Sequence, residues 1–222
     1  KNVRLYELGN IYIPKSLPVA EYPDERMQFT LGMYGEGDFF TMKGVVEEFL
    51  ESVGMTKKIT YDPNAGKSFL HPGRQALIQY KEIVIGYLGE VHPEVTDNYD
   101  IDTKVYIAVL DMPEILPYAS FDRKYEGIAK YPAVSRDISM VVPKNILVGD
   151  IEKVIEQRGG KILEDYQLFD IYEGSQIKSG YKSVAYAITF RAKDRTLEES
   201  DVSSAMKKIL NGLEGLGIEL RA

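Results

Sequence analysis

The order of strands and helices in the last hundred residues constrains the fold most. Apolar alternation predicts four strands, over residues 135–142, 162–172, 182–191 and 218–221. Apolar residues at helical spacing predict one helix over residues 148–158 and another that starts near Thr196, where Thr196 and Glu199 have the spacing of a capping box. This β-α-β-β-α-β order predicts a compact split βαβ domain. Three segments lie where a strand of this domain begins, ends or leads into a helix: 131–137 (YPAVSRD), 169–174 (FDIYEG) and 191–197 (RAKDRTL).

Strand alternation predicts which face of this small sheet the two helices cover. The bulky residues share one face, and both helices must pack on it: Ile138, Met140, Val142, Phe169, Ile171, Val184, Tyr186, Ile188 and Phe190. A bulge in the second strand is the alternative that would shift the register of Phe169 and Ile171. The opposite face carries the small residues Ser139, Ser183, Ala185 and Ala187. Tyr172 lies at the edge of this face, and the Arg191 side chain is close enough to reach it. A flat sheet face that carries an aromatic ring and a cation has the chemistry to bind unstacked bases of single-stranded RNA. The alternative is an exposed face that is small and polar for solubility alone.

The first half of the chain predicts a second domain of antiparallel strands. Strand-like segments cover residues 3–8, 29–33, 76–80, 83–88 and 105–110. Lys81 and Glu82 join the third and fourth of these segments as the predicted turn of a tight β-hairpin. Asp38 is placed to cap a helix whose inner face carries Met42, Val45, Val46, Phe49, Leu50 and Val53. Residues 1–120 therefore form one predicted domain, residues 121–127 a linker, and residues 128–222 the split βαβ domain. Because the chain opens inside strand-like material, we expect it to be a fragment of a longer protein.

Charge and composition set limits on location and partners. The net charge is −7, with 13 Lys and Arg against 20 Asp and Glu in residues 1–127 but 14 against 14 in residues 128–222. The second half therefore leaves room for a local basic surface. Cysteine is absent, and no apolar run has the length of a membrane-spanning helix. These features predict a cytoplasmic protein without a membrane partner.

Several candidate sites in the first half lack essential parts. The segment 35–40 (GEGDFF) begins like a phosphate loop but lacks the third glycine of GxGxxG, so a turn before a helix fits better. His71 and His92 each precede proline and have no partner at metal-ligand spacing, which favours turn, capping or hydrogen-bonding roles. Glu90 near His92 lacks a nucleophile or a second defined carboxylate. Arg74 is interpreted as a structural or subunit-interface anchor.

The chain resembles the C-terminal region of the β subunits of bacterial phenylalanyl-tRNA synthetases over essentially all 222 residues. The three segments above carry the resemblance, together with residues 4–9 (RLYELG), 38–44 (DFFTMKG), 71–76 (HPGRQA), 86–93 (GYLGEVHP), 182–183 (KS) and 220–221 (LR). Each motif alone is weak, but their order and spacing are highly specific.

The resemblance implies an α+β fold: an antiparallel class II synthetase-like sheet with helices, followed by a ferredoxin-like anticodon-binding domain. It implies a phenylalanine–tRNA ligase whose α subunit performs catalysis with ATP and magnesium (Mg²⁺), within an (αβ)2 heterotetramer that binds tRNA(Phe). It implies no catalytic, cofactor-binding or metal-binding residue in this chain, because the Arg-x-Glu of the second class II motif and the Arg of the third are missing.

The resemblance also places anticodon contacts at Ser139, Tyr172 and Ser183, which coincide with the small-residue face predicted from alternation. Four more side chains are candidate phosphate contacts, namely Arg136, Arg191, Lys193 and Arg195. Arg136 has the alternative of pairing with Asp137, and Arg195 that of serving the turn before Thr196. Two other functions stay open: a protein-interaction module without RNA function, and a small-molecule enzyme or sensor built on the split βαβ sheet.

Overall fold

The computed structural model describes residues 2–55, 59–122, 125 and 127–221. The chain divides into two compact units, residues 1–124 (unit 1) and 125–222 (unit 2). This division falls inside the predicted linker, residues 121–127, of which residues 123, 124 and 126 lie outside the described part. No helix among the described residues is long and apolar enough to span a membrane.

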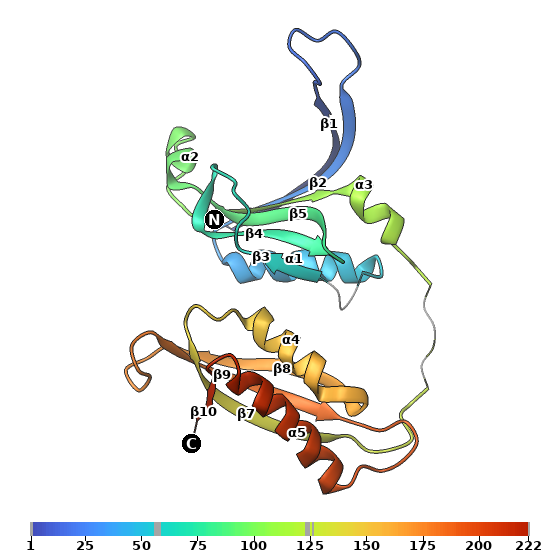
Figure 1. The fold of residues 1–222 in the computed structure, drawn as a ribbon. Helices are drawn as coiled ribbons and strands as arrows, with labels where there is room; N and C mark the ends of the chain where they lie inside the picture. Colours follow the sequence, from blue (N-terminus) through green and yellow to red (C-terminus); the bar gives the residue numbers. More distant parts are fainter. Residues whose placement is uncertain (1, 56–58, 123–124, 126, 222) are drawn as a thin grey trace. The chain divides into compact units, whose positions relative to one another are not determined.

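Unit 1 is built on an antiparallel sheet, as the sequence predicts, and this sheet has six strands. Its elements are β1 (Val3–Ile13), β2 (Asp24–Tyr34), α1 (Phe39–Ser52), β3 (Ile59–Asp62), β4 (Leu70–Tyr80), β5 (Ile83–Val91), α2 (Pro93–Asn98), β6 (Val105–Asp111), α3 (Met112–Ile115) and the 3₁₀ turn η1 (Leu116–Tyr118). The strand order is β1-β2-β6-β5-β4-β3, and α1 packs on one face of the sheet (Figure 1).

Helix α1 starts directly after Asp38, the N-cap that the sequence predicts. The Asp38 carboxylate accepts a hydrogen bond from the Thr41 amide at 2.8 Å, and this bond lowers the pKa of Asp38. The glycine-rich segment before the helix is thus a capped turn. Burial is narrower than predicted: Met42, Val46 and Leu50 are buried, whereas Val45 is 38% exposed. Residues four apart form one stripe along a helix, and Val45 lies at its edge.

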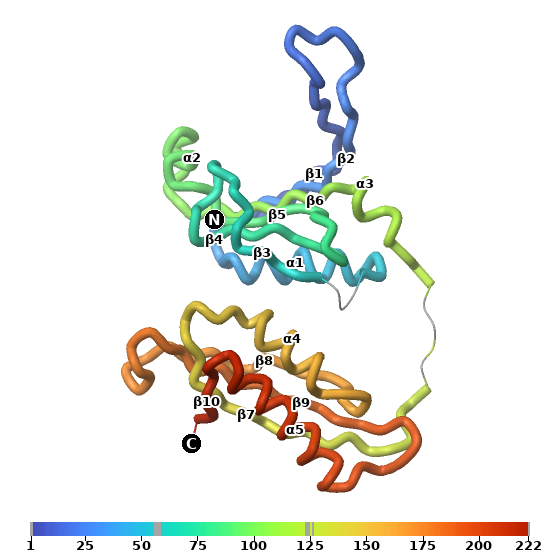
Figure 2. The backbone as a smooth tube through the Cα atoms, viewed as in Figure 1, coloured from blue at the N-terminus to red at the C-terminus, as the bar shows by residue number. Residues whose placement is uncertain are grey.

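The hairpin of β1 and β2 extends beyond the rest of its sheet (Figures 1 and 2). Strand β2 pairs with β6 only from Gln28 to Tyr34, so its first residues, from Asp24 to Met27, pair with β1 alone. Large apolar side chains are exposed along the hairpin and its turn-rich connection: Leu5, Tyr6, Leu8, Tyr12, Leu17 and Tyr22. Such a concentration of exposed apolar surface is typical of an interaction site.

The tight turn of the β4–β5 hairpin is confirmed, and both of its residues have positive φ angles. Lys81 has a φ of 49° and Glu82 a φ of 71°. Turns with two such residues match the twist of the flanking strands but strain side chains other than glycine, asparagine and aspartate. The turn therefore stores conformational strain at Glu82.

Replacing Glu82 with glycine should raise the free energy of unfolding by about 0.5–1 kcal/mol. The free energy gained by relieving the left-handed strain exceeds the free-energy cost of the entropy that glycine adds to the unfolded chain. Urea titration of the 222-residue chain would measure the change. The matched control is Glu7→Gly within β1, which should lower stability by about 0.5–1 kcal/mol because glycine is unfavourable inside a strand. A loss of stability in Glu82→Gly would contradict the expected relief.

Unit 2 has the β-α-β-β-α-β order that the sequence predicts. Its elements are β7 (Val134–Pro143), α4 (Val148–Gly159), the 3₁₀ turn η2 (Gly160–Ile162), β8 (Leu163–Tyr172), β9 (Tyr181–Phe190), α5 (Glu199–Glu214) and β10 (Glu219–Leu220). The sheet order is β10-β7-β9-β8, with both helices on one face (Figure 1). This is the ferredoxin-like arrangement.

Two local predictions in unit 2 are wrong. Thr196 does not cap α5: the cap is Glu198, whose backbone N–H donates to the Asp201 carboxylate at 3.1 Å, so the helix starts three residues after Thr196. Phe169 does not join the buried core and is 55% exposed. The cause is a bulge between Leu168 and Asp170, which places Tyr166 and Leu168 against the core instead.

Candidate nucleic-acid interface

The face of the unit 2 sheet that carries no helix is assembled from all four strands. Cross-strand partners lie on the same face of a sheet, so the register identifies its members. One row across the strands is Glu219, Val141, Ser183 and Tyr172, and the next contains Ser139, Ala185 and Asp170. We call these residues, together with Asp137, Ala187 and Arg221, the open face.

Tyr172 and Ser183 are directly opposite each other on β8 and β9. Ser139 lies on β7 opposite Ala185, one row away from Ser183. The three predicted anticodon contacts therefore share one face and one end of the sheet. The short Ser183 side chain lies between the larger side chains of Val141 and Tyr172, and this residue is only 3% exposed. Tyr172 is 38% exposed.

Arg221 completes this part of the open face, although the sequence alone did not identify it as a candidate contact. Its backbone N–H donates to the Ser139 carbonyl at 2.8 Å. Its guanidinium reaches the Ser183 hydroxyl at 3.5 Å. Arg221 thereby places a positive charge beside both serines. The signal in the sequence was the cation at the end of the last predicted strand, but only the pairing of β10 with β7 shows which serines it joins.

Three of the four candidate phosphate contacts are already paired with carboxylates. Arg136 donates to Glu199 at 2.6 Å, Arg191 to Glu164 at 2.8 Å and Arg195 to Asp201 at 2.9 Å. Hydrogen bonding from Arg136 lowers the pKa of Glu199. Within the described part of the chain, Lys193 has no such carboxylate partner.

Arg136 lies on the helix-covered side of β7, because its cross-strand partner is the core residue Ile188. Asp137 faces the other way, opposite Ala187. The alternative of a pair between Arg136 and Asp137 is therefore wrong, since Arg136 joins β7 to α5 through Glu199. Alternating side-chain direction keeps neighbours in a strand apart.

The remaining candidates, Arg191, Lys193 and Arg195, lie at the other end of the sheet from Tyr172. Arg191 follows Ser183 by eight positions along β9 and its continuation, which corresponds to roughly 25 Å along an extended strand. Arg191 also donates to the Tyr131 carbonyl at 2.7 Å, which ties the start of unit 2 to the end of β9. The structure thus separates the base-contact candidates from most of the phosphate-contact candidates.

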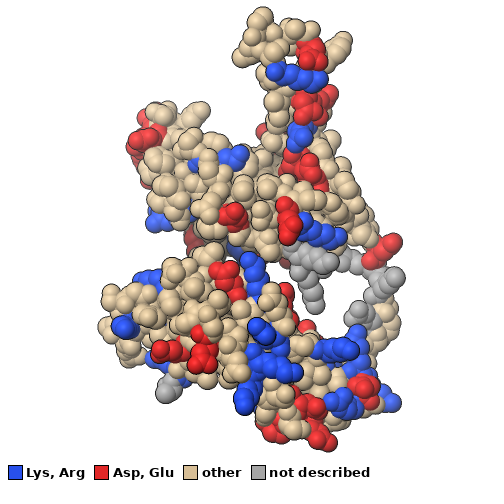
Figure 3. Space-filling model, in the orientation of Figure 1, with Lys and Arg blue, Asp and Glu red and all other residues tan. Residues whose placement is uncertain are grey.

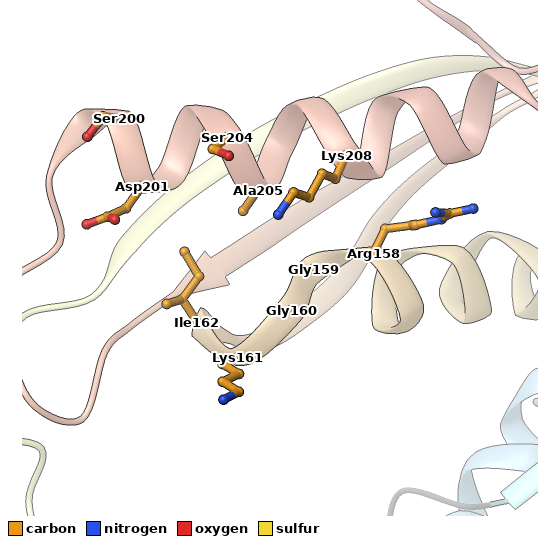
Figure 4. Close-up of a pocket in the computed structure, with 10 residues that line it drawn as sticks. All are labelled: Arg158, Gly159, Gly160, Lys161, Ile162, Ser200, Asp201, Ser204, Ala205 and Lys208. Atoms are coloured by element: carbon orange, nitrogen blue, oxygen red, sulfur yellow. The ribbon is translucent and has the colours of Figure 1, made fainter.

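A basic surface lies on the helix layer of unit 2, where Lys and Arg side chains gather over α4 and α5 (Figure 3). A polar groove of about 380 Å³ runs between the end of α4, η2 and the start of α5. Figure 4 shows Lys208 extending from α5 toward the Gly159–Gly160 turn, while Arg158 and Lys161 point away from each other. None of the anticodon or phosphate candidates lines this groove.

The polar residues of unit 1 that resemble an active site have structural partners. Arg74 donates to the Glu90 carboxylate at 2.9 Å, and the Tyr106 hydroxyl donates to its other oxygen at 3.2 Å. His71 accepts a hydrogen bond from the Gly73 amide, and His92 caps α2 by accepting one from Glu94. The predicted turn and capping roles of both histidines are confirmed. Among the described residues, no group of three or more His, Asp or Glu side chains is arranged to hold a metal ion.

Comparisons with known proteins match both units. The family described as "Phenylalanyl tRNA synthetase beta chain CLM domain" matches residues 1–112, and "Ferredoxin-fold anticodon binding domain" matches residues 129–221. A pyrrolysyl-tRNA synthetase structure from Desulfitobacterium hafniense covers 53% of this chain and 42% of its own at a TM-score of 0.42 and 12% identity, a level too low to bear on function.

Curated relatives are similar over nearly the whole chain. The phenylalanine–tRNA ligase beta subunit of Clostridium acetobutylicum is 45% identical over 219 residues, which is 98% of this chain and 27% of the relative. That of Bacillus subtilis is 34% identical over 223 residues, or 96% of this chain and 28% of the relative. The chain thus spans about a quarter of the length of these relatives. By both units and by these similarities, it belongs to the phenylalanyl-tRNA synthetase beta chain family.

Proposed function

We propose that this chain is the C-terminal part of a phenylalanine–tRNA ligase β subunit and that its open face binds the anticodon of tRNA(Phe). One observation carries the proposal: four side chains meet at one end of a sheet face that no helix covers. They are Tyr172 of β8, Ser183 of β9, Ser139 of β7 and Arg221, which follows β10. An aromatic ring next to hydroxyls and a cation is the chemistry that recognises an unstacked base.

Each residue has a distinct role in the proposed complex. The Tyr172 ring stacks on one anticodon base, and the hydroxyls of Ser139 and Ser183 exchange hydrogen bonds with base edges. Arg221 donates to an acceptor on a base or phosphate from its place beside Ser183. Lys193 holds a phosphate, while Arg136, Arg191 and Arg195 reach RNA only by exchanging a carboxylate for a phosphate. Binding to the isolated chain is therefore weak and depends mainly on the bases.

Unit 1 serves assembly of the ligase in this proposal. The exposed apolar side chains of the β1–β2 hairpin supply a contact surface for the α subunit within an (αβ)2 heterotetramer. ATP and Mg²⁺ act elsewhere in the cytoplasmic holoenzyme, because the residues of unit 1 do not fit them: the carboxylate of Asp38 caps α1, and that of Glu90 is held by Arg74 and Tyr106.

Titration with tRNA tests the anticodon assignment. The 222-residue chain should bind tRNA(Phe) at least about threefold more tightly than the same tRNA with one anticodon base replaced, because a lost base contact costs one or more hydrogen bonds. The measurement is fluorescence anisotropy at two salt concentrations. The preference should persist at the higher salt, since base contacts release few counterions.

Two outcomes would contradict the assignment. Equal affinity for both tRNAs, with a steep salt dependence, would indicate nonspecific attraction of the phosphate backbone. Absence of binding at either salt would favour a protein-interaction or small-molecule module.

A further inference from the structure

Gly174 lies against the ring of Tyr172, two residues after it in the chain. A Cβ atom built on Gly174 would be 2.0 Å from the Tyr172 hydroxyl oxygen and 2.2 Å from Cζ. These distances are far below van der Waals contact. The outer end of the Tyr172 ring therefore occupies the space that any side chain at residue 174 would need.

Space, and not backbone conformation, requires glycine here. The φ angle of Gly174 is outside the left-handed region, in contrast to Gly180 of the same loop, whose φ is 85°. Alanine could adopt the Gly174 backbone without strain. Its methyl group would instead have to displace the tyrosine ring.

The backbone beneath the ring is fixed at several points. The Gly174 carbonyl accepts a hydrogen bond from the Ile177 amide at 2.9 Å, which closes a turn at the end of β8. Next to it, Glu173 pairs with Lys144 at 2.6 Å, and this hydrogen bond lowers the pKa of Glu173. The ring itself has no such anchor: among the described residues, no hydrogen bond to the Tyr172 hydroxyl is formed. Packing on Gly174 is thus a principal restraint on the outer end of the ring.

We propose that Gly174 is a positioning residue that sets the height and tilt of the Tyr172 ring for base stacking, an inference that rests on the proposed function of the open face. A methyl group at residue 174 moves the ring tip by roughly 1 Å or more to reach normal contact. Ser183 is directly across from Tyr172, so a displaced ring no longer holds a stacked base within reach of the serine. Stability is nearly unaffected, because the ring is partly exposed and has room to rotate toward solvent.

A double-mutant cycle tests this inference on tRNA(Phe) binding. Gly174→Ala should weaken binding by about fivefold or more, a large part of the loss caused by Tyr172→Ala. In the Tyr172→Ala background, adding Gly174→Ala should change affinity by less than about twofold, because the ring through which Gly174 acts is gone. Gly149→Ala is the matched control, since a Cβ there meets no atom within 4 Å, and it should leave affinity unchanged.

A readout without RNA tests the contact itself. In NMR spectra of the unliganded chain, the Gly174 Hα protons should show nuclear Overhauser contacts to the Tyr172 ring, and Gly174→Ala should shift the ring resonances while the unfolding midpoint stays within experimental error. Absence of these contacts would overturn the inference.

The binding outcomes distinguish the positioning role of Gly174 from the anticodon assignment of the open face. Wild-type affinity in Gly174→Ala, or an equal loss with and without Tyr172, would overturn the positioning role while leaving the anticodon assignment intact. Wild-type affinity in Tyr172→Ala would overturn the stacking assignment and the positioning role with it.

Discussion

Replacing Tyr172 with alanine is expected to weaken the proposed binding of tRNA(Phe) by about 5- to 100-fold, the range that corresponds to the loss of one aromatic stack on a base. In the intact ligase, this change should lower aminoacylation at limiting tRNA. Phenylalanine-dependent pyrophosphate exchange needs no tRNA and should keep its rate. Parallel assays of the two activities measure the difference.

Two further variants sharpen this result. Tyr172→Phe keeps the ring and should retain most of the affinity. Tyr99→Ala removes an exposed tyrosine of unit 1 and should bind like the wild type. An equal loss of aminoacylation and pyrophosphate exchange in Tyr172→Ala would show that the residue supports the whole enzyme and not the tRNA contact.

Replacing Arg74 with methionine is expected to lower the free energy of unfolding by about 2–3 kcal/mol. The side chain of Glu90 is only 5% exposed, and Arg74 provides the cation that compensates its charge. Removing one member of a buried pair leaves an uncompensated charge. The expected loss of stability is smaller than the roughly 3–5 kcal/mol typical of a fully buried pair, because Arg74 is itself 47% exposed. Urea titration of the 222-residue chain provides the measurement.

A substitution at Glu90, the partner of Arg74, tests whether the lost stability is caused by its uncompensated charge. Glu90→Gln in the Arg74→Met background removes the charge and keeps an acceptor for the Tyr106 hydroxyl, so it should recover about 1 kcal/mol or more. Lys15→Met, at an exposed pair with Glu21, should change stability by less than about 0.5 kcal/mol. No recovery in the double variant would show that Arg74 stabilises unit 1 by packing instead of charge.

The sequence predicted unit 2 well because its alternation is regular. Cross-strand pairs such as Tyr172 with Ser183 follow from the period of two once the strands are recognised. Phe169 was misplaced because a bulge adds a residue that alternation cannot detect. The start of α5 was misplaced because Thr196 and Glu199 have the spacing of a capping box, whereas the Glu198 amide pairs with the Asp201 carboxylate and the helix begins at Glu199.

The sequence predicted less where a contact depends on distant segments. Arg136 and Glu199 are 63 residues apart, and Arg221 and Ser183 are 38 apart, so neither pair has a local signal. The short strand β3 was missed because four residues give too little alternation to identify a strand. In contrast, the Asp38 cap and the Lys81–Glu82 turn are set within a few residues and were predicted.

The internal pairing of Arg136, Arg191 and Arg195 has a consequence for competition among RNAs in the proposed function. A phosphate that approaches one of these arginines replaces a carboxylate already in place, so the exchange yields little net electrostatic gain. RNAs that offer only a phosphate backbone therefore compete poorly at these three arginines. Such a domain leaves general attraction for tRNA to other surfaces of the ligase and responds to the identity of the bases presented to it.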